Sequence, residues 1–135
     1  MGIPVQTFPD ITGCIGTIQG TKGPGKTLML RADIDALPIQ EADLTKPYAS
    51  QHSGVMHACG HDCHTAMLLG AAKILSAHRD AFPGQVKLLF QMGEEIGTES
   101  RHYVEKGCLD QVDAIFGMHI WPCWMQVPPI WKTGN

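Results

Sequence analysis

The chain has 135 residues, of which 44% are hydrophobic, so it has the length of one domain and enough apolar residues for a core. Its formal net charge is -3 and only 17% of its residues are charged, which argues against nucleic acid or a membrane surface as a partner. The sequence contains no 18-residue apolar stretch and no signal-peptide pattern at its start. Five cysteines in no paired pattern fit a reducing compartment, so we expect a cytoplasmic protein.

The first two thirds of the chain predict strands, a long loop and a helix. Strands are expected over residues 13–20 and 27–35, and the turn between them favours a hairpin or neighbouring strands. Residues 36–58 show no clear period and predict a long loop, a kind that is often functional. A helix is expected over residues 65–78, where apolar residues recur with helical spacing. The next strand, residues 85–92, is apolar on both faces and is therefore expected in the centre of the sheet.

The last third predicts one more helix and one more strand. A short helix is expected over residues 98–107, and a buried strand over residues 113–118. Strands that alternate with helices favour parallel pairing. The predicted fold class is therefore α/β, a three-layer α/β sandwich with a mostly parallel sheet.

Residues 57–64 form the densest chemical cluster, because six of these eight side chains can bind a metal or move a proton. A structural zinc site usually takes ligands in pairs, but the sequence has no two cysteines with two residues between them. Asp62 alone has a simpler explanation as a helix cap. The positive end of the predicted helix is expected to favour the thiolate at Cys59 or Cys63. An alternative that stays open is a non-enzymatic metal or thiol module built from Cys59, His61, Cys63 and His64.

More acids and a histidine follow the ends of predicted strands. Asp33 and Asp35 are two residues apart in an extended segment, so both side chains point to one face. Glu94 and Glu95 follow the next strand, and His119 follows the last one. Open α/β sheets bind ligands at the carboxyl ends of their strands, so these residues predict one site. Thiolate, imidazole and carboxylate ligands suit Zn²⁺ or Mn²⁺, and a second glutamate near the metal suits a general base in hydrolysis.

Five short segments form a series of motifs along the chain. They are residues 30–39, 54–62, 67–72, 94–95 and 114–119. Together they resemble the M20 metallopeptidase family, and most of all its amidohydrolases of N-acyl amino acids. The resemblance implies a zinc-peptidase-like catalytic domain and a metal-dependent hydrolase that releases an amino acid from an N-acyl conjugate.

The resemblance also implies a role for each matching residue. The implied metal ligands are Cys59, His61, Glu95 and His119. Glu94 is the implied general base. The residues expected to support the site are Asp33, Asp35, Asp62 and His64. Family members hold two ions, Zn²⁺ or Mn²⁺, and take a further histidine from far downstream, so we expect one ion for the four ligands present.

The resemblance divides the chain at residue 122. Residues 1–122 are expected to be part of the catalytic domain, without the lid or dimerisation domain of the family. Residues 123–135 are expected to form a C-terminal tail outside the family pattern. The expected partner is a small-molecule N-acyl amino acid, and a homodimer stays open beside a monomer. A truncated chain that binds metal but is weak or inactive is the alternative to an active hydrolase.

Overall fold

The computed structural model describes residues 1–121, which fold into one mixed sheet with helices. The strands are β1 (Val5–Thr7), β2 (Gly13–Gln19), β3 (Thr27–Asp33), β4 (Gln85–Gln91) and β5 (Ala114–Gly117). The helices are α1 (His61–Ala77), α2 (Ser100–Glu105) and a 3-10 turn at Arg79–Ala81. The short strand β1 was not expected from the sequence. Within the described part of the chain, no helix is both long and apolar enough to cross a membrane.

The strands lie in the order β1-β2-β4-β3-β5. Strand β3 pairs in parallel with both β4 and β5. Strand β2 pairs antiparallel with β1 and with β4. Parallel pairing is therefore confirmed for the three strands from β4 to β5, while the sheet as a whole is mixed.

Strand β4 lies between β2 and β3, so the predicted pairing of residues 13–20 with 27–35 is wrong. The prediction of a central strand at residues 85–92 is confirmed. The reason for both outcomes is the burial of β4 on its two faces. Leu88 and Leu89 point to opposite faces, and both are buried. A central position in the sheet covers both side chains. The free energy gained by this burial outweighs that of a local hairpin between β2 and β3.

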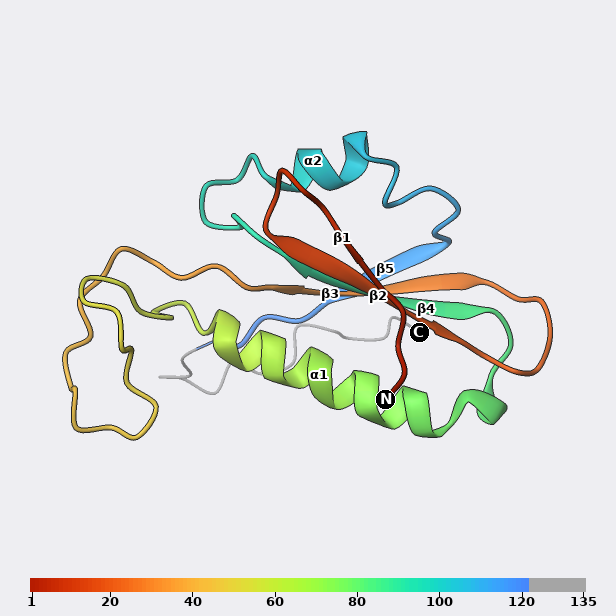
Figure 1. Ribbon diagram of the computed structural model, residues 1–135, viewed down its shortest axis with the longest axis horizontal. Helices are drawn as coiled ribbons and strands as arrows, with labels where there is room; N and C mark the ends of the chain where they lie inside the picture. The colour runs from red at the N-terminus through yellow and green to blue at the C-terminus, as the bar shows by residue number, and fades with distance from the viewer. Residues whose placement is uncertain (122–135) are drawn as a thin grey trace, which may run out of the picture.

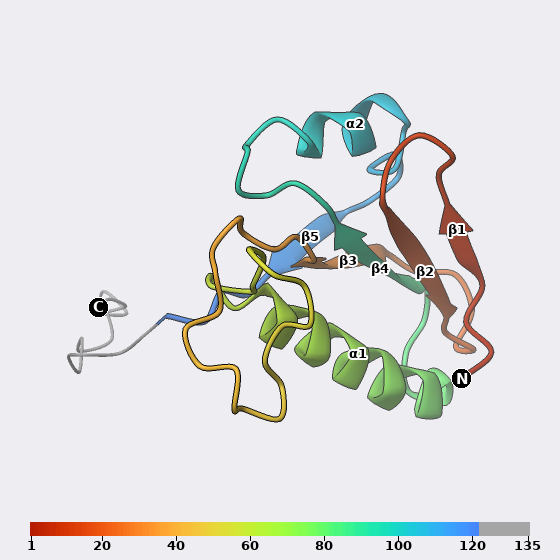
Figure 2. The same ribbon diagram turned by 60° about the vertical axis from the view of Figure 1, so that its left-hand side comes forward.

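Helices cover both faces of the sheet, which gives the three predicted layers. Helix α1 lies on one face and α2 on the other (Figure 1 and Figure 2). The apolar cluster on the α1 side contains Ile18, Ala32, Leu68, Ala72, Val86 and Leu88. The cluster on the α2 side contains Ile11, Ile15, Met29, Leu89, Tyr103 and Cys108.

Strand β5 lies at the edge of the sheet, and its predicted burial is wrong. Ile115 is 49% exposed and Phe116 is 57% exposed. Among residues 1–121, β5 has β3 as its one strand partner, so one of its edges stays uncovered there. The apolar composition that predicted a buried strand does not specify which neighbours cover it.

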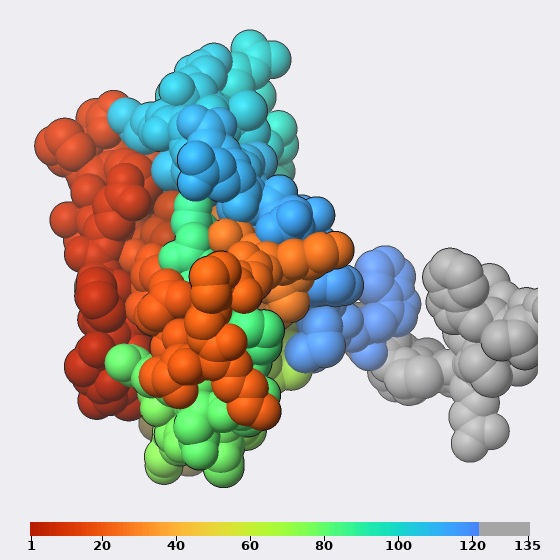
Figure 3. Space-filling view, turned by 90° about the vertical axis from the view of Figure 1, so that its right-hand side faces the viewer, coloured from red at the N-terminus to blue at the C-terminus, as the bar shows by residue number. Residues whose placement is uncertain are grey.

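Helix α1 begins at His61, four residues before the predicted start at residue 65. Gly60 precedes it with a φ of 88°, a conformation that suits glycine. The predicted loop over residues 36–58 is confirmed, with one isolated bridge between Leu37 and Met56. This loop projects from the end of the sheet at which α1 begins (Figure 1 and Figure 2). Figure 3 looks onto the opposite end, where the turn between β2 and β3 faces the viewer.

The Tyr103 hydroxyl joins α2 to the sheet, and its removal should destabilise the fold. It donates to the Thr12 carbonyl at 2.8 Å and accepts from the Met92 N–H at 3.1 Å. Tyr103→Phe removes two part-buried hydrogen bonds, each worth about 0.5–1.5 kcal/mol, so we expect a loss of about 1–3 kcal/mol in the free energy of unfolding. Denaturant unfolding of the chain measures this loss. The matched control is Tyr48→Phe at an exposed position, and equal losses in the two variants would contradict the explanation.

Candidate metal centre

The parallel register brings three strand ends to one place. Asp33 at the end of β3 pairs with Gln91 at the end of β4, and Gly117 of β5 pairs with Arg31. The segments that follow these strands therefore leave the sheet side by side. They carry the two aspartates, the two glutamates and the histidine predicted from the sequence. The N-terminus of α1 lies at the same end and adds residues of the 57–64 cluster.

His61 is the centre of this group, and its side chain is 1% exposed. Its Nδ1 lies 3.2 Å from Asp35 Oδ1. Its Nε2 is buried and has no hydrogen-bond partner among residues 1–121. Three carboxylate oxygens surround Nε2 beyond hydrogen-bond contact, from Glu95 at 3.6 Å and from Glu94 and Asp33 at 3.8 Å each. A buried nitrogen that faces carboxylates without bonding to them leaves room for a cation.

Asp35 sets the orientation and the tautomer of the His61 ring. Burial acts to raise the pKa of the Asp35 carboxyl, but the backbone N–H groups of Glu95 and Glu94 outweigh it and the net pKa is lowered. The Glu95 N–H donates to Asp35 Oδ2 at 3.1 Å. An ionised Asp35 accepts the proton of His61 Nδ1, which leaves the lone pair of Nε2 directed to the other side of the ring. Carboxylate–histidine pairs of this kind orient metal-binding imidazoles in proteins.

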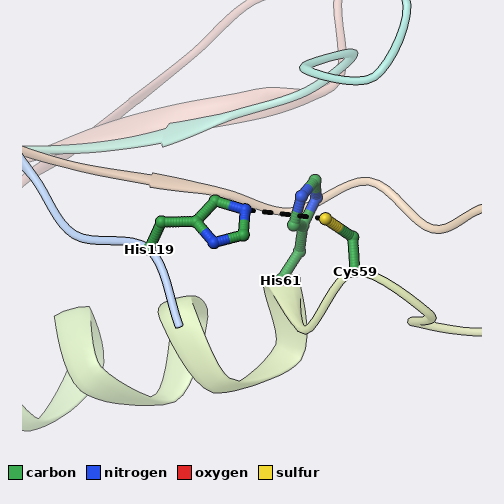
Figure 4. Close-up of side chains that lie close together, drawn as sticks. All are labelled: Cys59, His61 and His119. Atoms are coloured by element: carbon green, nitrogen blue, oxygen red, sulfur yellow. Dashed lines mark hydrogen bonds between the residues drawn. The ribbon is translucent and has the colours of Figure 1, made fainter. Parts of the chain in front are cut away.

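Cys59 and His119 approach the same ring from two other segments. Figure 4 shows Cys59 from the loop before α1, His61 from the start of α1 and His119 from the segment after β5. The Cys59 Sγ lies 3.5 Å from His119 Nε2. The other nitrogen of His119, Nδ1, donates to the carbonyl of Ile120. The Nε2 lone pair of His119 therefore faces the thiol.

For the metal-free chain, the prediction of a thiolate is wrong at Cys59. Its thiol has a pKa raised to about 11, first by a hydrogen bond with the Glu95 carboxylate, then by burial and by the negative charges of Glu95, Glu94 and Asp33. These acids outweigh the helix end, whose partial charge is about half an elementary charge. The same concentration of negative charge favours a bound cation.

The donor atoms of the cluster fit a divalent transition metal. One group of close ligand atoms comes from Cys59, His61 and His119, and a second comes from His61, Glu94 and Glu95. Within each group the atoms lie within 4.8 Å of one another, and His61 belongs to both. A cation at this place would satisfy the unpaired His61 Nε2. Sulfur and imidazole donors together suit Zn²⁺ better than Mg²⁺ or Ca²⁺.

Asp33 and His64 form a buried pair beside this cluster. His64 Nδ1 lies 2.6 Å from Asp33 Oδ1, and His64 Nε2 accepts the N–H of Ile120 at 2.8 Å. With His61 they form a third group of close donor atoms. Both ring nitrogens of His64 are already bonded, however, which sets it apart from His61.

Asp62 and Cys63 lie outside the centre. Gly60 is the residue at the helix cap, and no side chain caps the helix there. Asp62 instead sits in the first turn, where its Oδ1 accepts the N–H of Cys63 at 2.9 Å. Cys63 is exposed and belongs to no group of close donor atoms among residues 1–121. The geometry therefore gives no support to a module made from Cys59, His61, Cys63 and His64.

Two participants were not predicted from the sequence. Arg31 donates to Asp33 Oδ2 at 2.8 Å and to Gln91 Oε1 at 2.9 Å. The backbone of Ile120 bonds to both His64 and His119. The position of Arg31, two residues before Asp33 on one strand face, was a usable signal. A backbone group leaves no signal in a sequence.

The sequence of residues 29–130 matches the family model described as Peptidase family M20/M25/M40. An α/β domain with carboxylate, imidazole and thiol side chains at its strand ends agrees with this match. The chain belongs to this peptidase family. The match runs past residue 122, and the predicted boundary there stays a prediction. Residues 123–135, the predicted tail, lie outside the described residues.

Several relatives resemble large parts of the chain. An N-acetyl-L-cysteine deacetylase of Bacillus subtilis (strain 168) is 48% identical over 118 residues, which cover 87% of this chain and 28% of that protein. An N-acyl-L-amino acid amidohydrolase of Geobacillus stearothermophilus is 52% identical over 101 residues, covering 73% of this chain and 26% of that protein. The YXEP protein of Bacillus subtilis, a dinuclear metal binding peptidase from the M20 family, has a crystal structure that matches with a TM-score of 0.84. That match has 46% identity and covers 90% of this chain and 34% of the other. It confirms the predicted fold class, and the chain spans about 30% of the length of its curated relatives.

The raised pKa of Cys59 predicts slow thiol chemistry in the metal-free protein. At pH 8 a thiol with a pKa of about 11 is thiolate in about one molecule in a thousand, and the thiolate is the reactive form. Alkylation of Cys59, followed by peptide mass spectrometry, should therefore accelerate about tenfold per pH unit from pH 7 to pH 10. Glu95→Gln removes the largest cause of the shift and should speed the reaction at pH 8, while Glu105→Gln on the exposed side of α2 should not. Fast alkylation at pH 7 in the unaltered chain would contradict this assignment.

Proposed function

We propose that the chain supplies metal ligands and the general base of a hydrolase that cleaves the amide bond of N-acyl amino acids. The observation that carries this proposal is the buried, unpartnered Nε2 of His61, which faces carboxylates on one side and lies beside Cys59 and His119. Relatives named as a deacetylase and an amidohydrolase of N-acyl amino acids support the reaction class.

The proposed metal ligands are Cys59, His61, Glu95 and His119. The two glutamates lie at similar distances from His61 Nε2, so distance alone does not separate their roles. The Glu95 side chain is 27% exposed against 38% for Glu94, and Glu95 is the first cause of the raised pKa of the Cys59 thiol. This favours Glu95 as the ligand and leaves Glu94 closer to solvent and substrate.

A bound divalent ion in such a site lowers the pKa of water toward about 7 and polarises a carbonyl group. The thiol and imidazole donors favour Zn²⁺, or Mn²⁺ as the second choice. The four proposed ligands are enough for one ion. The dinuclear relative supports a second ion in longer members of the family.

Glu94 is proposed to move the proton in the reaction. Its carboxylate takes a proton from the attacking water as the new C–O bond forms at the acyl carbon. It then gives this proton to the amine nitrogen as the C–N bond breaks, which releases the amino acid and the acyl carboxylate. Asp35 holds the His61 ring in place through Nδ1 during these steps.

A hollow next to the start of α1 is large enough for a small molecule, although its lining residues include neither Glu94 nor any of the four proposed ligands. It has a volume of about 470 Å³ and lies between the 36–58 loop and the start of α1, with Tyr48, Met56, His57 and Asp62 among its lining residues. This volume is in the range of small-ligand sites.

We also propose a cytoplasmic location, because Cys14, Cys59, Cys63 and Cys108 are all free thiols.

A second candidate function is metal binding without appreciable hydrolysis by these 135 residues. The observation that favours it is that the chain aligns with only about 30% of the length of its curated relatives. Metal content and turnover of N-acetyl amino acids or hippurate, measured on the same sample, separate the candidates. Turnover that depends on added Zn²⁺ or Mn²⁺ supports the hydrolase, and bound metal without turnover supports the second candidate.

The two glutamates should respond differently to the same substitution. Glu94→Gln removes the proposed base, so hydrolysis should fall by about 100-fold or more while metal content is kept. Glu95→Gln removes a ligand, so metal affinity should fall. Turnover assays and metal analysis of both variants measure this, with Glu105→Gln on α2 as the control that changes neither. Metal-dependent turnover that survives Glu94→Gln would exclude Glu94 as the base.

A further inference from the structure

The imidazole of His64 is buried, with 2% of the residue exposed, and both of its nitrogens are bonded. The N–H of Ile120 can only donate, so Nε2 of His64 must be the acceptor in their 2.8 Å contact. The ring proton therefore sits on Nδ1 and is donated to Asp33 Oδ1 at 2.6 Å. This arrangement fixes one neutral tautomer of His64.

Asp33 is fully buried and anchors this ring to the centre of the sheet. Its Oδ2 accepts from the Arg31 guanidinium at 2.8 Å, which compensates the buried negative charge. Arg31 also donates to Gln91 Oε1 at 2.9 Å, so the anchor includes both β3 and β4. The position of the His64 ring is therefore set by the two central parallel strands.

Ile120 connects this anchor to His119. Its N–H is bonded to His64, and its carbonyl accepts from His119 Nδ1. Residues 118–121 follow β5 without regular secondary structure, so they lack the ladder of bonds that holds a strand. The His64 and His119 rings also contact each other, with centroids 4.6 Å apart. Fixing Ile120 fixes the direction of the His119 ring, whose Nε2 lies 3.5 Å from Cys59 Sγ.

We propose that His64 is a positioning residue for His119, acting through the backbone of Ile120 and held in place by Asp33 and Arg31. The proposal rests on the proposed function in one respect, the assignment of His119 as a metal ligand. The competing role for His64 is that of a ligand itself, since it lies near His61 and Asp33. Its two occupied nitrogens argue against that role.

The first test uses the metal-free chain and does not depend on any metal site. NMR of the unaltered protein should show a nitrogen–nitrogen coupling across the hydrogen bond from Ile120 to His64 Nε2. His64→Leu should speed amide hydrogen exchange at Ile120 on the order of tenfold, while the amides of β4 keep their protection. His78→Leu, the same change at the exposed end of α1, should leave Ile120 unchanged. Absence of the coupling overturns the proposal, even if the leucine variant does not fold, and so does unchanged Ile120 exchange in a folded variant.

The second test separates positioning from ligation by a double-mutant cycle on Zn²⁺ affinity. His64→Leu should weaken binding by about 10- to 100-fold, the usual range for residues that orient a ligand. In the His119→Ala background the same change should add little, because the residue that it positions is gone. An equal further loss in that background overturns the proposal and makes His64 an independent ligand. If the unaltered chain binds no Zn²⁺, the proposed function fails, and the coupling and exchange at Ile120 still decide whether His64 holds this segment.

Discussion

The parallel pairing of β3 with both β4 and β5 determines which segments of the chain meet at the candidate metal centre. Parallel strands end at the same edge, so this pairing alone brings residues that are far apart in the sequence to one place. The register that aligns Asp33 with Gln91 decides which side chains emerge there. Helix α1 packs against the same strands and starts at that edge, so that His61 lies among the strand-end acids. A shift of one residue in the register of β3 would turn Asp33 to the opposite face of the sheet.

The end of β3 holds two histidines through two aspartates. Asp35 pairs with His61 and leaves its Nε2 without a partner, whereas Asp33 pairs with His64, whose Nε2 is bonded to a backbone N–H. The two imidazoles are three residues apart on α1 and stack with centroids 5.5 Å apart. The aspartate–histidine pair thus serves two purposes. The His61 ring keeps a free nitrogen toward the acids, and the His64 ring holds the segment that follows β5.

Much of this arrangement could be predicted from the sequence, because apolar patterns and strand ends depend on local information. The loop, the helices and the central strand follow from such patterns, and so does the gathering of acids at one edge. The pairing of residues 13–20 with 27–35 failed because strand order depends on burial across the whole sheet. The thiolate predicted at Cys59 failed for the metal-free chain because the acids that raise the pKa of this thiol come from other segments. The bond from Ile120 to His64 involves a backbone group, which no residue pattern reveals.

The proposed metal centre has Cys59 as its single sulfur ligand. X-ray absorption of the Zn²⁺-loaded chain measures the ligand set of the ion. We expect one sulfur at about 2.3 Å and nitrogen or oxygen donors at about 2.0–2.2 Å. The sulfur signal should disappear in Cys59→Ser and persist in Cys63→Ser, which removes the exposed thiol in the first turn of α1. A sulfur ligand that survives Cys59→Ser, or that is lost in Cys63→Ser, would exclude Cys59 as the single sulfur ligand.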